Sequence, residues 1–131
     1  MPLTPELTVL GWSLVLFLAH MVVQSTTALR DRGAAFNAGP RDDPKPLGRI
    51  AARAERAFAN YQETWPVFAA LALGLAVTGR SGGFAATGAW IWLAARVVYL
   101  PLYVLGVPYL RSLCWAVAGA GLVMMAVRLF F

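Results

Sequence analysis

The sequence predicts an all-α integral membrane protein with a bundle of four transmembrane helices. Hydrophobic residues occupy 60% of its 131 positions and charged residues only 13%, which is far more apolar than a soluble domain. Four apolar runs of roughly 20 residues, each long enough to cross a bilayer about 30 Å thick, would use most of the chain. We therefore expect a single membrane domain over residues 1–131, with no separate soluble domain.

The single cysteine, Cys114, and the single histidine, His20, exclude several kinds of site. One thiol cannot form an internal disulfide, and one imidazole cannot build a histidine-rich metal centre, so we expect no metal. The net charge of +5 would raise nucleic acid as a partner for a soluble chain. Because the basic residues here gather between apolar runs, we expect no nucleic acid partner.

The first apolar run, residues 7–29, is predicted to be the first span. We do not expect a cleaved signal peptide, because no Lys or Arg precedes this run. His20 and Gln24 share one face of the helix, where we expect packing or helix–helix hydrogen bonds rather than ligand binding. Residues 30–47 are rich in Arg, Asp, Gly and Pro, which predicts an exposed loop.

The second helix is predicted over residues 48–78 and is asymmetric along its length. Its first half is charged, and only its second half, from Trp65 onward, is purely apolar. The charged half must therefore project into the cytoplasm or lie buried between helices. The third and fourth spans are predicted over residues 84–105 and 109–131, after short turns that contain glycine.

The distribution of basic residues predicts the orientation. They concentrate in or beside the first and third loops, at Arg30, Arg32, Arg41, Lys45, Arg49 and Arg111. By the positive-inside rule these loops face the cytoplasm. Four spans then place both termini outside the cytoplasm.

Polar residues form one stripe on each of the two middle helices. At about 100° per residue, the stripe of the second helix contains Arg49, Arg53, Arg56, Asn60 and Glu63, and that of the third contains Arg96, Tyr99 and Tyr103. A charge at mid-membrane costs about 2.5 to 3.5 kcal/mol on insertion scales, so these stripes must meet partners or water. Guanidinium, carboxylate, amide and phenol groups together suit a small zwitterionic, peptide-like ligand.

Other interpretations of these residues stay open. Arg56 and Glu63 could neutralise each other across a helix interface, and the two tyrosines could be interfacial belt residues. Arg111 and Ser112 begin the last helix, where a guanidinium and a helix N-terminus would favour an anion such as a thiolate. Alternatively, Arg111 only reaches cytoplasmic headgroups.

Two motifs carry a resemblance to a known family. The sequence Arg53-x-x-Arg56-Ala57-x-x-Asn60-x-x-Glu63 followed by Pro66-x-Phe68, and then Arg96-x-x-Tyr99-x-x-x-Tyr103, resembles the MAPEG superfamily, membrane-associated proteins in eicosanoid and glutathione metabolism. The resemblance spans nearly the whole chain and is closest to bacterial-type members similar to microsomal glutathione transferases. It implies a homotrimer in the bacterial inner membrane that holds glutathione between neighbouring subunits, near the cytoplasmic side.

The resemblance also implies roles for individual residues. Arg111 would stabilise the glutathione thiolate, with Ser112 beside it as the second catalytic residue. Glutathione, as co-substrate, would be bound by Arg30, Arg53, Arg56, Asn60, Glu63, Arg96, Tyr99 and Tyr103. Arg32 is the alternative to Arg30 for a contact made by a neighbouring subunit.

Three hypotheses for the function follow. The first is a membrane-bound glutathione transferase, or a glutathione peroxidase, that detoxifies lipophilic electrophiles entering from the membrane lipids. The second is a non-catalytic lipid-binding or scaffold member, because Phe58 and Thr64 replace the Gln and Tyr of leukotriene C4 synthase. The third is a small four-span exporter in which Glu63 couples protons. Such exporters carry their acidic residue in the first span, and residues 7–29 contain none.

Overall fold

The computed structural model describes residues 2–131, and all of its regular secondary structure over that range is helical. Residue 1 of the predicted domain lies outside the described residues. The helices are α1 (Pro5–Arg32), α2 (Ala34–Ala38), α3 (Arg49–Val77), α4 (Gly83–Leu105) and α5 (Pro108–Phe130). The predicted all-α fold is confirmed.

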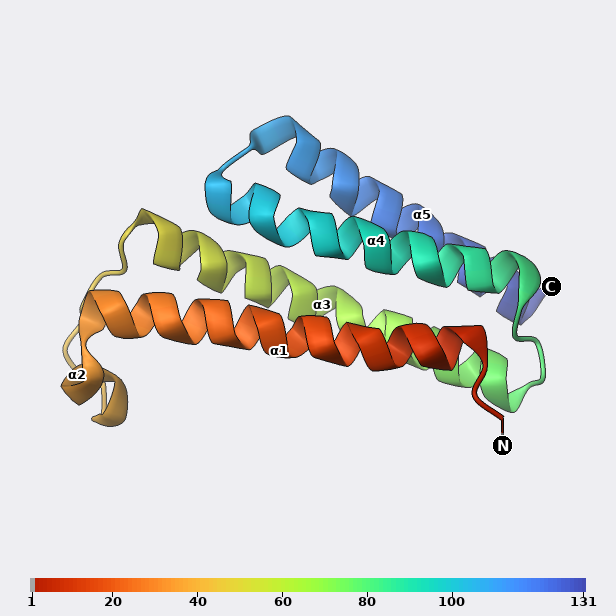
Figure 1. Cartoon of the computed structure of the whole chain (residues 1–131), viewed down its shortest axis with the longest axis horizontal. Coiled ribbons are helices and arrows are strands. Elements are labelled where there is room, and N and C mark those ends of the chain that lie inside the picture. The colour runs from red at the N-terminus through yellow and green to blue at the C-terminus, as the bar shows by residue number, and fades with distance from the viewer. Residues whose placement is uncertain (1) are drawn as a thin grey trace.

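The four long helices run side by side in two pairs (Figure 1). Helix α1 packs against α3, and α4 packs most extensively against α5. The chain termini and the turn between α3 and α4 lie at one end of the bundle, which we call the terminal end. The segment containing α2 and the turn between α4 and α5 lie at the opposite end, which we call the loop end.

Each long helix begins and ends within three residues of its predicted range. The start of α1 has a local cause, because the Thr4 side chain accepts a hydrogen bond from the backbone N–H of Leu7 at 3.2 Å and caps the first turn. The end of α1 also has a local cause, because Gly33 adopts φ 85°, a left-handed conformation that favours glycine. The short helix α2, in the segment predicted to be a loop, was not expected.

Three helices, α1, α4 and α5, are long and apolar enough to cross a membrane. Large apolar side chains such as Leu18, Val22 and Val123 are exposed on these helices, as expected for a surface that meets lipid. Helix α3 is not among the three, because its N-terminal half is charged. At 29 residues it is about 43 Å long, which is enough to cross a membrane. Because its composition keeps it out of this set, the prediction that it forms a fourth span stays a prediction.

Aromatic residues join the two helix pairs, and small residues hold α4 against α5 within one pair. The rings of Phe68 on α3 and Trp92 on α4 stack in parallel with centroids 4.0 Å apart. Between α4 and α5, Gly88 and Gly121 bring the two backbones together, since a Cβ at Gly88 would lie 2.6 Å from the carbonyl oxygen of Gly121. This close approach fixes the position of α5 on α4.

Glu6 lies in the first turn of α1 and is fully buried. One of its carboxylate oxygens accepts a hydrogen bond from the backbone N–H of Gly82 at 2.7 Å. Helix α1 therefore contains two acidic residues, Glu6 and Asp31, and both lie just outside the range predicted for the span. Glu6 ties two helix N-termini together at the terminal end, and neither residue stands in the middle of the helix.

Candidate functional site

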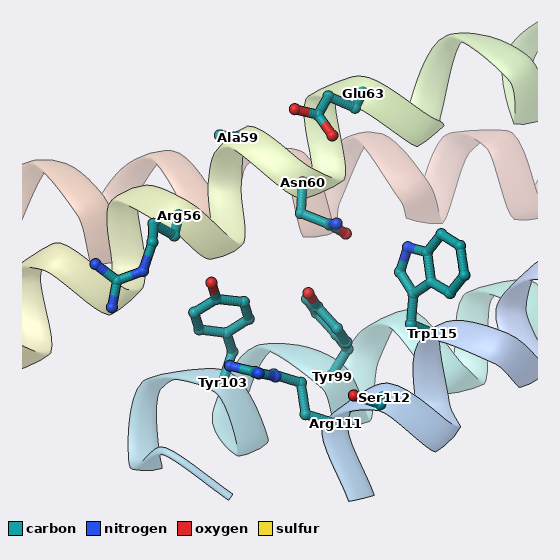
Figure 2. A pocket seen from close by; sticks show the side chains of 9 residues that line it. All are labelled: Arg56, Ala59, Asn60, Glu63, Tyr99, Tyr103, Arg111, Ser112 and Trp115. Atoms are coloured by element: carbon teal, nitrogen blue, oxygen red, sulfur yellow. The ribbon is translucent and has the colours of Figure 1, made fainter. Parts of the chain in front are cut away.

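A polar cavity of about 460 Å³ lies between α3, α4 and α5. Its α3 residues belong to the N-terminal half of that helix, which is the half nearer the loop end (Figure 1). Figure 2 shows the side chains that line the polar cavity, namely Arg56, Ala59, Asn60, Glu63, Tyr99, Tyr103, Arg111, Ser112 and Trp115. Seven of the ten residues predicted to form the site are in this set. The volume lies within the range of small-molecule binding pockets.

Helix α3 contributes Arg56, Asn60 and Glu63 because residues three and four apart share one helix face. Arg56 and Glu63 are separated by two turns, about 10 Å along the axis, and no ion pair joins them. Within residues 2–131 the only ion pair links Arg30 to Asp31, at 3.9 Å. The interpretation in which Arg56 and Glu63 neutralise each other is therefore wrong for this chain.

Helix α4 contributes Tyr99 and Tyr103, whose ring centroids are 5.5 Å apart. Both phenol groups point from α4 towards α3 (Figure 2). Tyr99 is buried and Tyr103 is half-buried, so their hydroxyl groups meet the cavity rather than the outer surface of the bundle. This placement does not fit the interpretation of the two residues as belt residues.

Helix α5 contributes Arg111, Ser112 and Trp115. The Arg111 guanidinium lies over the ring of Tyr103, with its carbon 4.5 Å from the ring centroid, in the range of a cation–π contact. Pro108 begins the helix, and no side chain caps its first turn. The positive end of the helix and Arg111 therefore both favour an anion beside Ser112.

Arg96 was predicted to contact the ligand, but it does not line this cavity. It is fully buried beneath Tyr99, with its guanidinium carbon 4.2 Å from that ring and 5.3 Å from the ring of Tyr61. Its Nη1 donates a hydrogen bond to Oδ1 of Asn60 at 2.8 Å. Because the amide oxygen is engaged, the amide nitrogen of Asn60 is left to donate to a ligand.

The remaining predicted ligand residues lie outside the cavity within this chain. Nη1 of Arg53 donates to the carbonyl oxygen of Val104 at 3.4 Å, near the C-terminus of α4, where positive charge is favourable. The Arg30 side chain is 73% exposed, and Nε of Arg32 donates to the carbonyl oxygen of Lys45 at 2.7 Å. Contacts from these arginines to a ligand held by a neighbouring subunit stay a prediction.

Two cavity residues, Ala59 and Trp115, were not predicted from the sequence. Trp115 follows Arg111 by four residues, so the helix period places both on one face. This spacing is the signal that could have identified it, although a tryptophan within an apolar run is otherwise typical of packing. Ala59 has no polar group and leaves space between Arg56 and Glu63.

The two departures from the family pattern lie away from the polar cavity. Phe58 packs edge-on against Phe17 of α1 with centroids 5.2 Å apart. The Thr64 hydroxyl donates to the backbone carbonyl groups of Asn60 and Tyr61, both at 3.3 Å. Neither substitution therefore removes a polar group from the cavity of this chain.

The cavity lining has a definite charge and chemistry. Two guanidinium groups and one carboxylate give it a net charge of +1, and the amide and hydroxyl groups add neutral donors and acceptors. Across residues 2–131 no three His, Cys, Asp or Glu side chains cluster as they would around a metal ion. The arrangement can bind a small anionic molecule that also contains an ammonium group.

Comparison with known proteins gives one match. The family model described as MAPEG family matches residues 9–131, nearly the whole chain. No significantly similar sequence was found among curated proteins, and no significantly similar structure among solved structures.

Proposed function

The chain belongs to the MAPEG family, and from this premise we propose that it is a membrane-bound glutathione transferase. Family membership and three apolar helices make it an integral membrane protein of glutathione or eicosanoid metabolism. The proposal adds the reaction, in which the sulfur of glutathione is joined to a lipophilic electrophile. It also assigns the polar cavity as the place where glutathione binds.

The observation that carries the proposal is the charge of the polar cavity. Glutathione has two carboxylates and one ammonium group, so its net charge near neutral pH is −1, opposite to the +1 of the lining. Arg56 would bind a carboxylate and Glu63 the ammonium group, because these are the charge-assisted hydrogen bonds that each can form. The amide nitrogen of Asn60 would donate to a carbonyl group of the peptide.

The chemistry would take place beside Arg111 and Ser112. The glutathione thiol loses its proton to solvent, and the thiolate is stabilised by the Arg111 guanidinium and the N-terminus of α5. The sulfur then forms a bond to the electrophilic carbon while the leaving group departs with the electron pair of its own bond. Trp115 supplies an apolar wall on which a lipophilic substrate would rest near the thiolate, in position for attack. In the peroxidase reaction the same thiolate would attack one oxygen of a hydroperoxide and break its O–O bond, and the departing alkoxide would take a proton from solvent to become an alcohol. A second glutathione would then react with the resulting sulfenic acid to give glutathione disulfide and water.

The proposal includes the arrangement in the membrane. Helix α3 would cross as the fourth span, with its charged stripe turned to the polar cavity rather than to lipid. Both termini would lie outside the cytoplasm, and the loop end, with the polar cavity, would face the cytoplasm. By family resemblance the protein would be a homotrimer in a bacterial inner membrane, with Arg30 or Arg32 of a neighbouring subunit completing the contacts to glutathione.

Conjugation of 1-chloro-2,4-dinitrobenzene to glutathione by the purified protein in detergent tests the proposed reaction. We expect glutathione-dependent turnover that saturates with both substrates. A folded sample that binds glutathione without turnover would favour the non-catalytic alternative. A folded sample that neither binds glutathione nor turns over would contradict both.

A further inference from the structure

A second cavity, of about 270 Å³, lies at the loop end between the last turns of α1 and the segment that contains α2. That segment packs beside the end of α1 (Figure 1). We call it the α2 cavity, and its polar lining consists of Gln24, Ser25, Arg32, Asn37 and Arg41, with Leu29 and an alanine as apolar residues. None of these side chains is a carboxylate, so the two guanidinium groups give the lining a net charge of +2. The α2 cavity shares no residue with the polar cavity.

Protein contacts hold both guanidinium groups in place but leave some of their donors free. Nε of Arg32 donates to the carbonyl oxygen of Lys45 at 2.7 Å, and its guanidinium carbon lies 5.4 Å from the ring centroid of Phe36. Nε and Nη2 of Arg41 donate to the carbonyl oxygen of Asn37 at 3.1 and 2.8 Å. Over residues 2–131, both Nη atoms of Arg32 and Nη1 of Arg41 donate to no protein group. Positioned guanidinium groups with free donors suit the oxygens of a phosphate.

No carboxylate neutralises the two arginines of the α2 cavity. The single ion pair found over residues 2–131 involves neither of them. Asp42 and Asp43 follow Arg41 in the chain but line a separate cavity with it rather than this one. Nζ of Lys45 donates to the carbonyl oxygen of Arg32 at 2.8 Å, which adds a third positive charge beside the α2 cavity. The C-terminal end of α1 offsets only about half of one elementary charge, so the region favours an anion.

The α2 cavity lies at the end of a helix that is apolar enough to cross a membrane. At 28 residues, α1 is about 42 Å long, which exceeds the roughly 30 Å of a hydrocarbon core, so its last turns reach the headgroup level. Leu18 and Val22 are exposed and share one helix face with Ser25 and Leu29, which line the α2 cavity. An apolar stripe of Leu18, Val22 and Leu29 therefore leads from the cavity towards the middle of the bilayer.

We propose that the α2 cavity binds the phosphate of an anionic phospholipid, with an acyl chain along the apolar stripe of α1. Basic pockets at the ends of membrane helices bind such headgroups. The free donors of Arg32 and Arg41 would bond to the phosphate oxygens. Phosphatidylcholine also has a phosphate, but its quaternary ammonium group would meet a positive lining without a carboxylate. Arg32 would then serve the α2 cavity, which leaves Arg30 to contact glutathione in a neighbouring subunit.

Thermal unfolding of the full-length protein in detergent provides the first test. Phosphatidylglycerol and phosphatidylcholine with identical acyl chains are titrated in parallel. We expect a saturable rise in the unfolding temperature with phosphatidylglycerol that exceeds the rise with phosphatidylcholine, because a ligand that binds the folded state stabilises it. Equal rises with the two lipids would overturn the proposal. Inorganic phosphate should act only at much higher concentration, since it has no acyl chain. Half-saturation at the same concentration as phosphatidylglycerol would make the α2 cavity a site for free phosphate and contradict a lipid site.

Two matched arginine variants sharpen the test. Arg41→Gln removes one positive charge and its fork of donors from the α2 cavity, and we expect it to weaken phosphatidylglycerol binding about ten-fold, the effect of one hydrogen bond to a charged group. Arg49→Gln removes the same charge from an exposed position at the start of α3, outside the α2 cavity. It should bind the lipid as the parent protein does. Both side chains are exposed and neither forms an ion pair within residues 2–131, so both variants should fold. Equal lipid affinity in the two variants would contradict the site.

Competition with glutathione separates this proposal from the proposed function. Because the two cavities share no residue, saturating glutathione should leave the phosphatidylglycerol effect unchanged. Displacement of the lipid by glutathione would overturn the lipid site and assign the α2 cavity to glutathione. A phosphatidylglycerol effect in a protein that does not bind glutathione would support the lipid site and contradict only the proposed function.

Discussion

At the terminal end of the bundle, charged side chains hydrogen-bond to the backbone of neighbouring helices, whereas at the polar cavity they do not. Glu6 accepts from the N–H of Gly82 at 2.7 Å, and Nη1 of Arg80 donates to the carbonyl oxygen of Leu129 at 2.8 Å. Around the polar cavity, Arg56 and Glu63 contact no opposite charge within residues 2–131. Both ends belong to one apolar chain of four long helices.

Structural charges in this protein therefore differ from charges that await a ligand in whether they bond to the backbone of a neighbouring helix. A charge that satisfies a helix terminus contributes to stability, and its removal leaves a backbone group without a partner. A charge that faces a cavity without a partner contributes little to stability, so its retention requires another explanation. Substitutions at the terminal end should therefore change stability, and those at the polar cavity should change function.

The largest effect is expected at Arg111. Arg111→Ala should lower turnover about 10²- to 10³-fold, the usual effect of removing one group that stabilises a developing anion. Glutathione affinity should fall much less, because Arg56 and Glu63 remain. Steady-state kinetics with an electrophilic substrate measures the effect. Arg128→Ala, near the other end of the same helix, is the matched control and should retain full activity.

A smaller effect is expected at Arg56. Arg56→Ala should weaken glutathione binding roughly 10- to 100-fold, since hydrogen bonds to charged groups contribute about 1.5 to 3 kcal/mol. The unfolding temperature should not fall, because Arg56 has no ion-pair partner among the described residues. A variant that binds glutathione normally but unfolds earlier would reverse the assignment and make this arginine structural.

A substitution in the close contact between α4 and α5 should lower stability rather than glutathione affinity, which is the reverse of the effect expected for Arg56→Ala. Gly88→Ala would place a methyl group against the carbonyl oxygen of Gly121 and the side chain of Met124. Overpacking of this kind costs about 1 to 3 kcal/mol, so the unfolding temperature should fall. Gly11→Ala, where no atom lies within 4 Å of the added methyl group, should be neutral or slightly stabilising. Equal unfolding temperatures for the two variants would contradict the packing.

The smallest effect is expected at Glu6. Glu6→Gln keeps an oxygen to accept from Gly82 but removes the charge that favours a helix N-terminus, which should cost about 0.5 to 1 kcal/mol. Thermal unfolding measures this loss. Glutathione affinity should stay unchanged, since Glu6 lies at the terminal end. A loss of glutathione affinity without a loss of stability would show that Glu6 is a functional rather than a structural charge.

Helix bounds and the polar face of α3 could be predicted from sequence because they depend on local chemistry. Long apolar runs, with glycine and proline between them, define the helices, and a spacing of three and four residues places Asn60 and Glu63 on one side. The structure differs where tertiary contacts decide. A helix period gives the direction of Arg96 but not its depth, so it could not show that Tyr99 covers it.

Other features could not be predicted from the sequence because they depend on where a second helix lies. Arg53 was assigned to the ligand because it shares the stripe of Arg56, but the C-terminus of α4 lies beside it and takes its guanidinium. The spacing of Trp115 from Arg111 places both residues on one helix face, but only the position of α5 in the bundle shows that this face lines the cavity. The short helix α2 follows a break at Gly33, and its five residues are too few to give a periodic signal.

Calorimetric titration of glutathione into the parent protein and into Arg56→Ala tests most directly whether glutathione explains the unpaired charges of the polar cavity. We expect saturable binding to the parent protein and binding at least ten-fold weaker to the variant, with both proteins folded. Absence of binding to the folded parent protein, or equal affinity in the two proteins, would contradict it.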